Sequence, residues 1–594
     1  MMHLFKQPAL RWIVLVGLLI IPWLSLLLPP GQREFLFIHG AYWVLTCYLL
    51  GFLGTVGHLL HHYRNHWISW FQQNRFLCTC SIIVSLALTV MISTTNDSFY
   101  KTLSDETNLL SISRSLWLKK QPYNITEGIY YYHNFQHLDR DLPKRHLLQP
   151  YLVHLLHLVR GYDWRNPFLL NQLALFALLS SITLAFGRRY GVTIGISAAC
   201  LTASSPLLFL FANSAGFDFL SLCLLWWSVL CLILGAQQRP AWIQLGAWFA
   251  AGFVQIRYEN GVLVLGAFVF WLLLCRPGRP TWRGWIAQWG QSSFASWLGI
   301  FNLMLVMANI QTSLSLDKME NKDEALLSLG HLQNHLPELL RALFLFEVPG
   351  DHTVSPYRPL LWWALLFLCL VWTYRWITKQ NWEQLVAGIR SPWKWQTGLF
   401  CAALGLVFVQ LCIFLSHYFG RPTHPTAVRY YLPLVCFASW SCCWLILQLR
   451  SHHLVRALFL TLVGLLPLLY WPIAQNQRFI NQLTLNRETK HIYEVVLRAP
   501  RKDTLYIHER PGQIAVLERG AVSVRRANRE LKKYQKNLRQ GLIQELVYLR
   551  RTDTDSAKDQ KLLNNGDWIE EQRFMITTKR ELVVLRHRKK NELD

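Results

Sequence analysis

Two acidic residues begin a long polar stretch that interrupts the apolar runs of this sequence. Asp105 and Glu106 follow Ser104 and precede an amphipathic segment that ends at Lys119 and Lys120. Acids in a first turn and lysines in a last turn are also what a helix lying on a membrane surface would carry for its own stability. At such a surface, however, a carboxylate can accept a proton from an attacking hydroxyl or amine, or help to bind a divalent cation.

A basic cluster closes the same polar stretch. Lys144, Arg145 and His146 stand immediately before the next apolar run, which resumes near Tyr151. Lysine and arginine are common phosphate ligands in proteins, and tyrosines suit a membrane interface. We predict that the three basic residues contact an anionic head group.

A second basic segment, residues 417–433, contains two arginines and no carboxylate. Arg421 and Arg429 can each offer a planar guanidinium to two oxygens of one phosphate, and Tyr430 follows directly. Arg429 also precedes an apolar run, so a purely anchoring role at the membrane surface is an alternative. Phosphate binding is the interpretation that we favour.

Charged residues also interrupt apolar sequence at two further places. Arg257 and Glu259 separate two apolar stretches of about 15 residues, and Asp218 opens another stretch. Charges within a membrane are costly and usually face a cavity. An Arg257–Glu259 pair that only closes a hairpin, and a first-turn acid at Asp218, are the structural alternatives.

The composition requires these residues to be held by membrane helices. Of the 594 residues, 52% are hydrophobic and only 16% are charged, which excludes a soluble enzyme and a fibrous protein. Thirteen apolar runs are long enough to count as spans. They lie near residues 11–29 (an uncleaved anchor), 41–63, 77–96, 168–186, 192–211, 216–235, 242–256, 261–275, 289–308, 360–377, 397–415, 431–449 and 456–474.

Basic residues in alternate short loops set the expected orientation. By the positive-inside rule the N-terminus is cytoplasmic, and thirteen spans then place the C-terminus outside. This topology explains the net charge of +25 better than nucleic-acid binding does, because the charge lines no single face. All 13 cysteines lie in or beside apolar runs, so we interpret them as core residues and predict no disulfide framework.

The C-terminal tail differs from the rest of the chain. We divide the sequence into N-terminal membrane helices (1–96), a first outer loop with interfacial helices (97–167), the remaining membrane core (168–474) and a small soluble α/β domain (475–594). The tail has 26 Lys and Arg against 16 Asp and Glu. Its pattern predicts a helix at 525–540, a turn at Asn565-Gly566 and strands at 504–508, 514–517, 542–549, 573–577 and 581–585.

Taken in order, these features resemble the GT-C class of membrane glycosyltransferases, such as the bacterial aminoarabinose transferases and the protein mannosyltransferases. The resembling features are Asp105-Glu106, the basic segment that runs to Pro150-Tyr151, the outer Asp218, Arg257-Tyr258-Glu259, Arg429-Tyr430 and the soluble tail. In that class the acidic pair usually follows the first span, whereas here it follows the third.

The resemblance implies a reaction as well as a fold. A polyprenyl-phosphate sugar would be the donor and an envelope lipid, glycan or protein the acceptor, with the enzyme embedded in the bilayer of a bacterial inner membrane. Asp105 would be the base, Glu106 its helper, and the basic residues would bind the departing phosphate, giving inversion. The family sometimes uses a divalent cation, but no ligand cluster establishes one here. A lipid-linked polysaccharide ligase or polymerase, a secondary transporter and a non-catalytic scaffold are the alternatives.

Overall fold

The computed structural model divides the chain into two compact units. The helical unit comprises Met1–Phe99, His146–Gln149 and Phe168–Gln477, and the mixed unit comprises Tyr100–Arg145, Pro150–Pro167 and Arg478–Asp594. The structure describes residues 17, 20–95, 98–100, 103–131, 134–235, 240–257, 260, 292–316, 328–344, 407, 409–417, 429, 432–433, 484–499, 503–552, 557–577 and 580–588.

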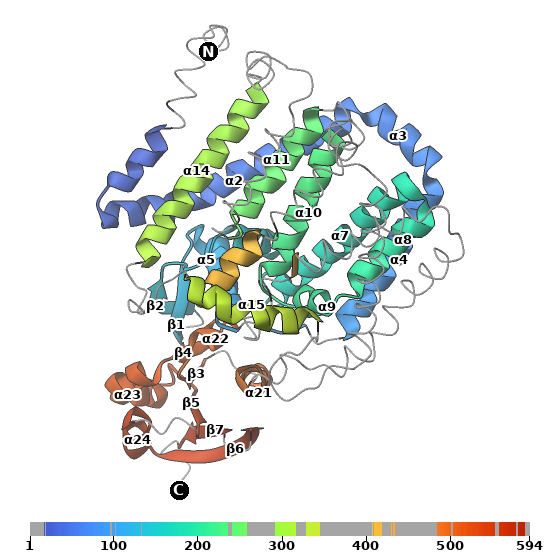
Figure 1. The fold of residues 1–594 in the computed structure, drawn as a ribbon. Coiled ribbons are helices and arrows are strands. Elements are labelled where there is room, and N and C mark those ends of the chain that lie inside the picture. The colour runs from blue at the N-terminus through green and yellow to red at the C-terminus, as the bar shows by residue number, and fades with distance from the viewer. Residues whose placement is uncertain are drawn as a thin grey trace. The chain divides into compact units, whose positions relative to one another are not determined.

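Long apolar helices dominate the described part of the helical unit (Figure 1). Its elements are η2 (Ser25–Leu27), α2 (Pro30–His62), α3 (Arg64–Gln73), α4 (Arg75–Thr95), α7 (Asn166–Tyr190), α8 (Val192–Ala203), α9 (Pro206–Ala212), α10 (Asp218–Gly235), α11 (Pro240–Val254), α14 (Ser292–Leu316) and α15 (Leu329–Phe344). Within the described residues, α2, α4, α7 and the stretch 297–314 of α14 are long and apolar enough to cross a membrane.

Most predicted spans that fall on described residues are helical, with two differences. Helix α2 begins at Pro30, eleven residues before the predicted start, because proline is well suited to a first helical position. The prediction of one span over 192–211 is wrong in detail. Two helices stand there, since Pro206 cannot continue α8 and instead starts α9.

Several predicted spans cannot be compared in this way. The spans at 261–275, 360–377 and 456–474, most of 397–415 and 431–449, and part of 11–29 lie outside the described residues. The number of thirteen spans therefore stays a prediction.

Buried polar contacts hold the helices of this unit together. Trp248 of α11 is fully buried and donates its indole N–H to the Thr55 hydroxyl of α2 over 2.8 Å. Its backbone carbonyl accepts a hydrogen bond from Tyr48, also on α2. Arg33 of α2 donates to Ser313 of α14 over 2.9 Å. These contacts satisfy polar atoms that would be costly to bury alone.

The mixed unit contains a single seven-stranded sheet drawn from two distant parts of the chain. The first part contributes α5 (Leu103–Lys119), β1 (Asn124–Tyr131), β2 (Asn134–Asp141) and α6 (Leu148–Arg160), whose first two residues belong to the helical unit. The second contributes α21 (Thr484–Arg498), β3 (Thr504–Ile507), α22 (Gly512–Ala515), β4 (Gly520–Val522), α23 (Val524–Arg539), β5 (Glu545–Arg551), α24 (Ala557–Asn564), β6 (Trp568–Thr577) and β7 (Arg580–His587).

The strands of this sheet lie in the order β2-β1-β4-β3-β5-β7-β6. Strand β3 is parallel to β4 and β5, and the other pairs are antiparallel. The parallel pairs require crossover connections, which α22 and α23 provide. Strand β1 joins β4 at the pair Gly128–Ala521, so the loop strands extend the C-terminal sheet.

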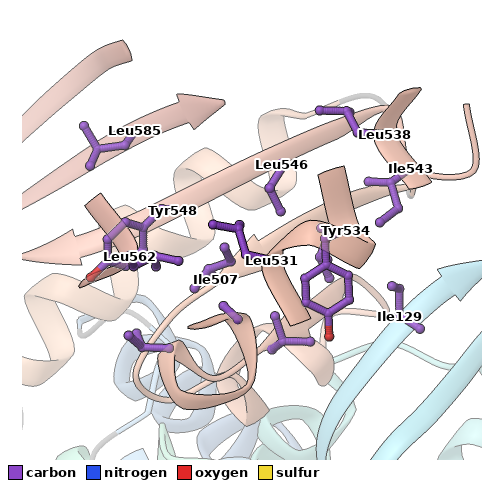
Figure 2. Packing of buried hydrophobic residues seen from close by; sticks show 14 of the residues in the cluster. Ile129, Ile507, Leu531, Tyr534, Leu538, Ile543, Leu546, Tyr548, Leu562 and Leu585 are labelled. Atoms are coloured by element: carbon purple, nitrogen blue, oxygen red, sulfur yellow. The ribbon is translucent and has the colours of Figure 1, made fainter. Parts of the chain in front are cut away.

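The core of the mixed unit lies between α23 and this sheet (Figure 2). Leu531, Tyr534 and Leu538 recur at helical spacing along α23 and pack in the same cluster as Ile507 and Leu546 of the strands. Each fully buried leucine or isoleucine contributes about 1.5–3 kcal/mol. Ile129 of β1 belongs to the same cluster, so the two chain segments share one core.

The tail agrees with the sequence in part: one predicted strand is wrong, and β4, α21 and α24 were not predicted. Strands form near 504–508, 542–549, 573–577 and 581–585, a helix forms at Val524–Arg539, and the chain turns at Asn565-Gly566. The strand predicted at 514–517 is wrong: Gly512–Ala515 is a short helix. A short apolar run is buried in either conformation, so its pattern does not distinguish them. The two loop strands β1 and β2 were not predicted.

Candidate active site

The first acidic candidate is paired with the basic cluster. Asp105 lies in the first turn of α5, and Arg145 lies in the connection between β2 and α6. The Arg145 guanidinium donates to both carboxylate oxygens of Asp105 at 3.1 Å, and its Nε donates to Oδ1 at 3.2 Å. The Asp105 side chain is 15% exposed and that of Arg145 is 38% exposed. The pair is therefore a forked ion pair that water can reach.

The neighbours of this pair face different surroundings. Glu106 is buried, as expected for adjacent helix positions that point about 100 degrees apart. Lys144 is exposed. His146 is buried in the helical unit, where its Nδ1 lies 3.3 Å from Oε1 of Gln311. The cluster Lys144-Arg145-His146 therefore does not present one continuous face, and its contact with a head group stays a prediction.

A second charged cluster forms inside the helical unit. Asp218 opens α10, and its carboxylate contacts the guanidinium of Arg257, just after α11. Nη1 of Arg429 lies 3.6 Å from the other carboxylate oxygen of Asp218. The three side chains are 5–8% exposed. Both guanidinium groups also lie near the ring of Phe217, at 4.9 Å and 5.9 Å from its centroid.

Amide side chains fix the loop that presents Asp218. Asn171 of α7 donates to the carbonyls of Ser214 and Gly216 at 2.8 and 2.9 Å. Gln149 donates to the carbonyl between them, that of Ala215, at 3.0 Å. Sequence analysis missed Asn171 and Gln149, although an amide within an apolar run is a signal that a buried backbone group needs a partner.

A further polar network continues beside the cluster. Asn260 donates to Ser221 of α10 at 3.1 Å and to the carbonyl of Phe253 at 2.8 Å. Gln410 donates to the Asn260 side-chain oxygen at 3.4 Å. Asn260 directly follows the segment Arg257-Tyr258-Glu259 singled out in the sequence, whereas Ser221 and Gln410 were not singled out.

The structure thus assembles the predicted residues into two groups. Asp105 and Arg145 form one pair in the mixed unit, and Asp218, Arg257 and Arg429 form one cluster in the helical unit. Three candidates, Glu259, Arg421 and Tyr430, lie outside the described residues. Across the described ranges, no group of three or more His, Cys, Asp or Glu side chains could hold a metal ion.

This arrangement suits an anionic ligand within a membrane protein. Two guanidinium groups from segments about 170 residues apart converge on one carboxylate, and planar guanidinium groups match carboxylate and phosphate oxygens equally well. Asp218 and Arg257 lie at or just beyond the ends of the shorter apolar helices α10 and α11, in the unit that contains the four described helices long enough to span a bilayer. The fold and the cluster therefore define an integral membrane protein with a buried, positively charged site.

One known family matches the central part of the chain. Residues 144–306 match the family model of the dolichyl-phosphate-mannose-protein mannosyltransferases, and the match includes both Asp218 and Arg257. Over these residues the chain is similar to mannosyltransferases that use a lipid-phosphate sugar. This agrees with the resemblance inferred from the sequence and favours an enzyme over a transporter.

Solved structures of similar proteins are distant in sequence. ArnT from Cupriavidus metallidurans bound to undecaprenyl phosphate has 11% identity and a TM-score of 0.48, with 85% of this chain and 97% of that chain covered. The oligosaccharyltransferase of Archaeoglobus fulgidus in complex with Zn and sulfate has 11% identity and a TM-score of 0.43, covering 80% and 68%. Arabinosyltransferase EmbB from Mycobacterium smegmatis has 14% identity and a TM-score of 0.32, covering 68% and 40%. No curated protein matches the sequence.

Proposed function

We propose that this glycosyltransferase moves a sugar from a polyprenyl phosphate to an envelope acceptor, which is a lipid, glycan or protein, on the outer face of a bacterial inner membrane. The observation that carries the proposal is the convergence of Arg257 and Arg429 on Asp218 within apolar helices. Polar groups buried at such a cost are usually functional. The N-terminus is then cytoplasmic and the C-terminal segment is outside, as basic loops indicate.

Arg257 and Arg429 bind the donor phosphate in this proposal. Asp218 keeps the two guanidinium groups close together in the absence of the donor. When the donor binds, its phosphate oxygens accept hydrogen bonds from the same guanidinium N–H groups. Charge grows on the phosphate as its bond to the sugar breaks. Guanidinium groups already in place stabilise that charge without reorganisation.

Asp105 is the proposed base, with Glu106 as its buried neighbour. The carboxylate takes the proton of an acceptor hydroxyl or amine while that atom forms a bond to the anomeric carbon. The bond from that carbon to the phosphate oxygen breaks, and the polyprenyl phosphate leaves with the electron pair. A single displacement inverts the anomeric centre. Arg145 orients the carboxylate and is exposed enough to exchange this contact for one with substrate, and Lys144 adds positive charge nearby in the chain.

The test is the substitution Asp105→Asn, which keeps the shape of the side chain and removes the base. We expect sugar transfer to fall about 10²–10⁴-fold. Mass spectrometry of envelope lipids and glycans, with and without the gene, identifies the product and then measures its loss in the variant. Asp139→Asn, an exposed carboxyl on β2, is the matched control. Wild-type transfer by a folded, inserted Asp105→Asn protein would refute the assignment.

A further inference from the structure

The first turn of α23 is completed by a residue from a distant part of the chain. Ser523 is the N-cap, and its hydroxyl accepts the backbone N–H of Arg526. In a capping box, an acid at the third position of the same helix accepts the N–H of the cap residue. Here that position is Arg526, and Glu127 of β1 accepts the Ser523 N–H at 3.1 Å instead. Glu127 also forms an ion pair with Arg526.

A second contact joins α5 to the same region. Arg114 of α5 lies 3.3 Å from Glu518, with its side chain only 3% exposed. Its guanidinium also covers the ring of Phe135 of β2 at 4.3 Å. Glu518 has a backbone φ of +57°, a left-handed conformation that is strained for a residue with a Cβ. Glycine would relieve this strain, so the acid at this position has a use beyond the turn.

The two contacts lie at the two ends of one strand. Glu518 lies two residues before β4, Ser523 follows it directly, and β4 itself pairs with β1. An ion pair, a strand pair and a helix cap therefore fasten the first loop to the C-terminal segment around three residues of β4. Because Arg114 is on the helix that carries Asp105, this fastening fixes that helix within the mixed unit.

We propose that Glu518 and Glu127 are positioning residues, which hold α5 and so present the Asp105–Arg145 pair. A role of these contacts in catalysis rests on the proposed function. The contacts that join the first loop to the C-terminal segment do not depend on it. The C-terminal segment is then part of the scaffold of the first loop rather than a separate accessory domain.

Amide hydrogen exchange of the full-length protein tests the proposal at Glu518. Glu518→Gly removes the ion pair and also relieves the backbone, so a role in the turn alone predicts equal or slower exchange. Positioning predicts exchange at least about tenfold faster in α5 and β1, because loss of one partner leaves a buried guanidinium uncompensated. Lys120→Gly is the matched control, since Lys120 also has a left-handed backbone, with φ of +55°, at the end of α5.

Two further pairs of variants separate charge from general damage. Glu518→Asp keeps the carboxylate and should restore part of the protection that Glu518→Gln loses. For the cap, Glu127→Gln keeps an acceptor for the Ser523 N–H, so it should loosen β1 and the first turn of α23 less than Glu127→Ala does. Exchange in α7 and α10 reports whether each variant is folded.

The pattern of exchange decides the outcome. Faster exchange confined to α5, β1 and the first turn of α23 supports positioning. An unchanged exchange rate in α5 of the Glu518→Gly variant overturns the proposal. Equally faster exchange throughout the mixed unit, including β6 and β7, also overturns it. No substrate is needed, so this result is independent of the proposed function. Full sugar transfer by Asp105→Asn would remove the catalytic role of the pair and leave the fastening intact.

Discussion

At the residue scale, the Asp218 cluster shows why these charges tolerate burial. An isolated buried ion would cost several kcal/mol, whereas Asp218 lies between Arg257 and Arg429 and an aromatic ring lies near both guanidinium groups. Removing one of the three side chains leaves the remaining charges buried with fewer partners, which costs free energy of folding. Substitutions therefore need a comparison that separates charge from shape.

Substitution of Arg429 by two different residues provides that comparison. Arg429→Ala removes both the charge and the fork, and Arg429→Lys retains the charge alone. If Arg429 binds the donor phosphate, we expect alanine to raise KM for the lipid donor much more than lysine does. The alanine effect should reach about 10- to 100-fold, as for a hydrogen bond to a charged group. Equal effects of the two variants would favour a structural role.

A buried histidine gives the mixed unit a pH dependence. His157 of α6 accepts a hydrogen bond from Asn166 at Nδ1 over 2.7 Å, and its Nε2 lies 3.1 Å from the Ser113 hydroxyl. That hydroxyl donates to the Leu110 carbonyl, which assigns the proton of the neutral ring to Nε2. Burial, with a smaller effect of His154, lowers the pKa of His157 to about 3. Protonation would set a second N–H against the Asn166 amide.

We therefore expect acid to destabilise the mixed unit. The folded form keeps His157 neutral, so stability is full above a pH of about 6.5 and is lost as pH falls from there toward 3. The loss is about 1.4 kcal/mol per pH unit for each proton that only the unfolded chain binds. Hydrogen exchange in α5 and α6 between pH 7 and pH 4 measures it. His157→Gln should flatten the profile and His491→Gln, on α21, should not. An unchanged profile in His157→Gln would contradict the assignment.

At the element scale, glycine permits two helices to approach closely. A Cβ on Gly195 of α8 would lie 2.4 Å from the backbone carbonyl of Thr183 and 2.9 Å from the backbone of Gly187, both on α7. Backbone atoms cannot move aside as a flexible side chain can. The α7–α8 hairpin therefore depends on the absence of a side chain at this position.

Gly195→Ala should destabilise the helical unit by about 1–3 kcal/mol, the usual cost of overpacking. Gly57→Ala on α2 is the control, because a Cβ there meets nothing within 4 Å and alanine is the better helix former. Thermal unfolding in detergent, followed by tryptophan fluorescence, compares the two variants with the wild-type protein. A stable Gly195→Ala protein would show that α7 and α8 can separate without loss.

Helix periodicity also explains the different surroundings of the acidic pair. Asp105 and Glu106 are adjacent in sequence, yet one contacts the exposed Arg145 and the other is buried. Burial chiefly raises the pKa of Tyr100, and the charge of Glu106 adds a smaller effect. Glu106 is buried within the mixed unit, which also contains Tyr100.

At the scale of the whole molecule, we propose from the basic loops that the mixed unit is extracytoplasmic. Gln560 is exposed on α24, so Gln560→Cys provides a label site in this unit. An impermeant thiol reagent should modify it in intact cells once any outer envelope is passed. The unsubstituted protein is the control for its own 13 cysteines. Protection of residue 560 until the cells are lysed would reverse the orientation.

The sequence by itself determined the membrane class, most described helices, most strands of the tail and the residues worth testing. Apolar run length, alternation and charge are local properties, so they can be read without a structure. Asp105 and Arg145 lie in one loop, and both were predicted as site residues. Their contact with each other was not predicted.

Only the tertiary structure decided which distant residues meet. Asp218, Arg257 and Arg429 are separated by 39 and 172 positions, and Glu127 caps a helix 396 positions away from it. No local pattern encodes such pairs, because each depends on how helices and strands pack after they form. The same reason hides β1 and β2: β1 becomes a strand because β4 offers it unpaired backbone groups, and β2 then pairs with β1.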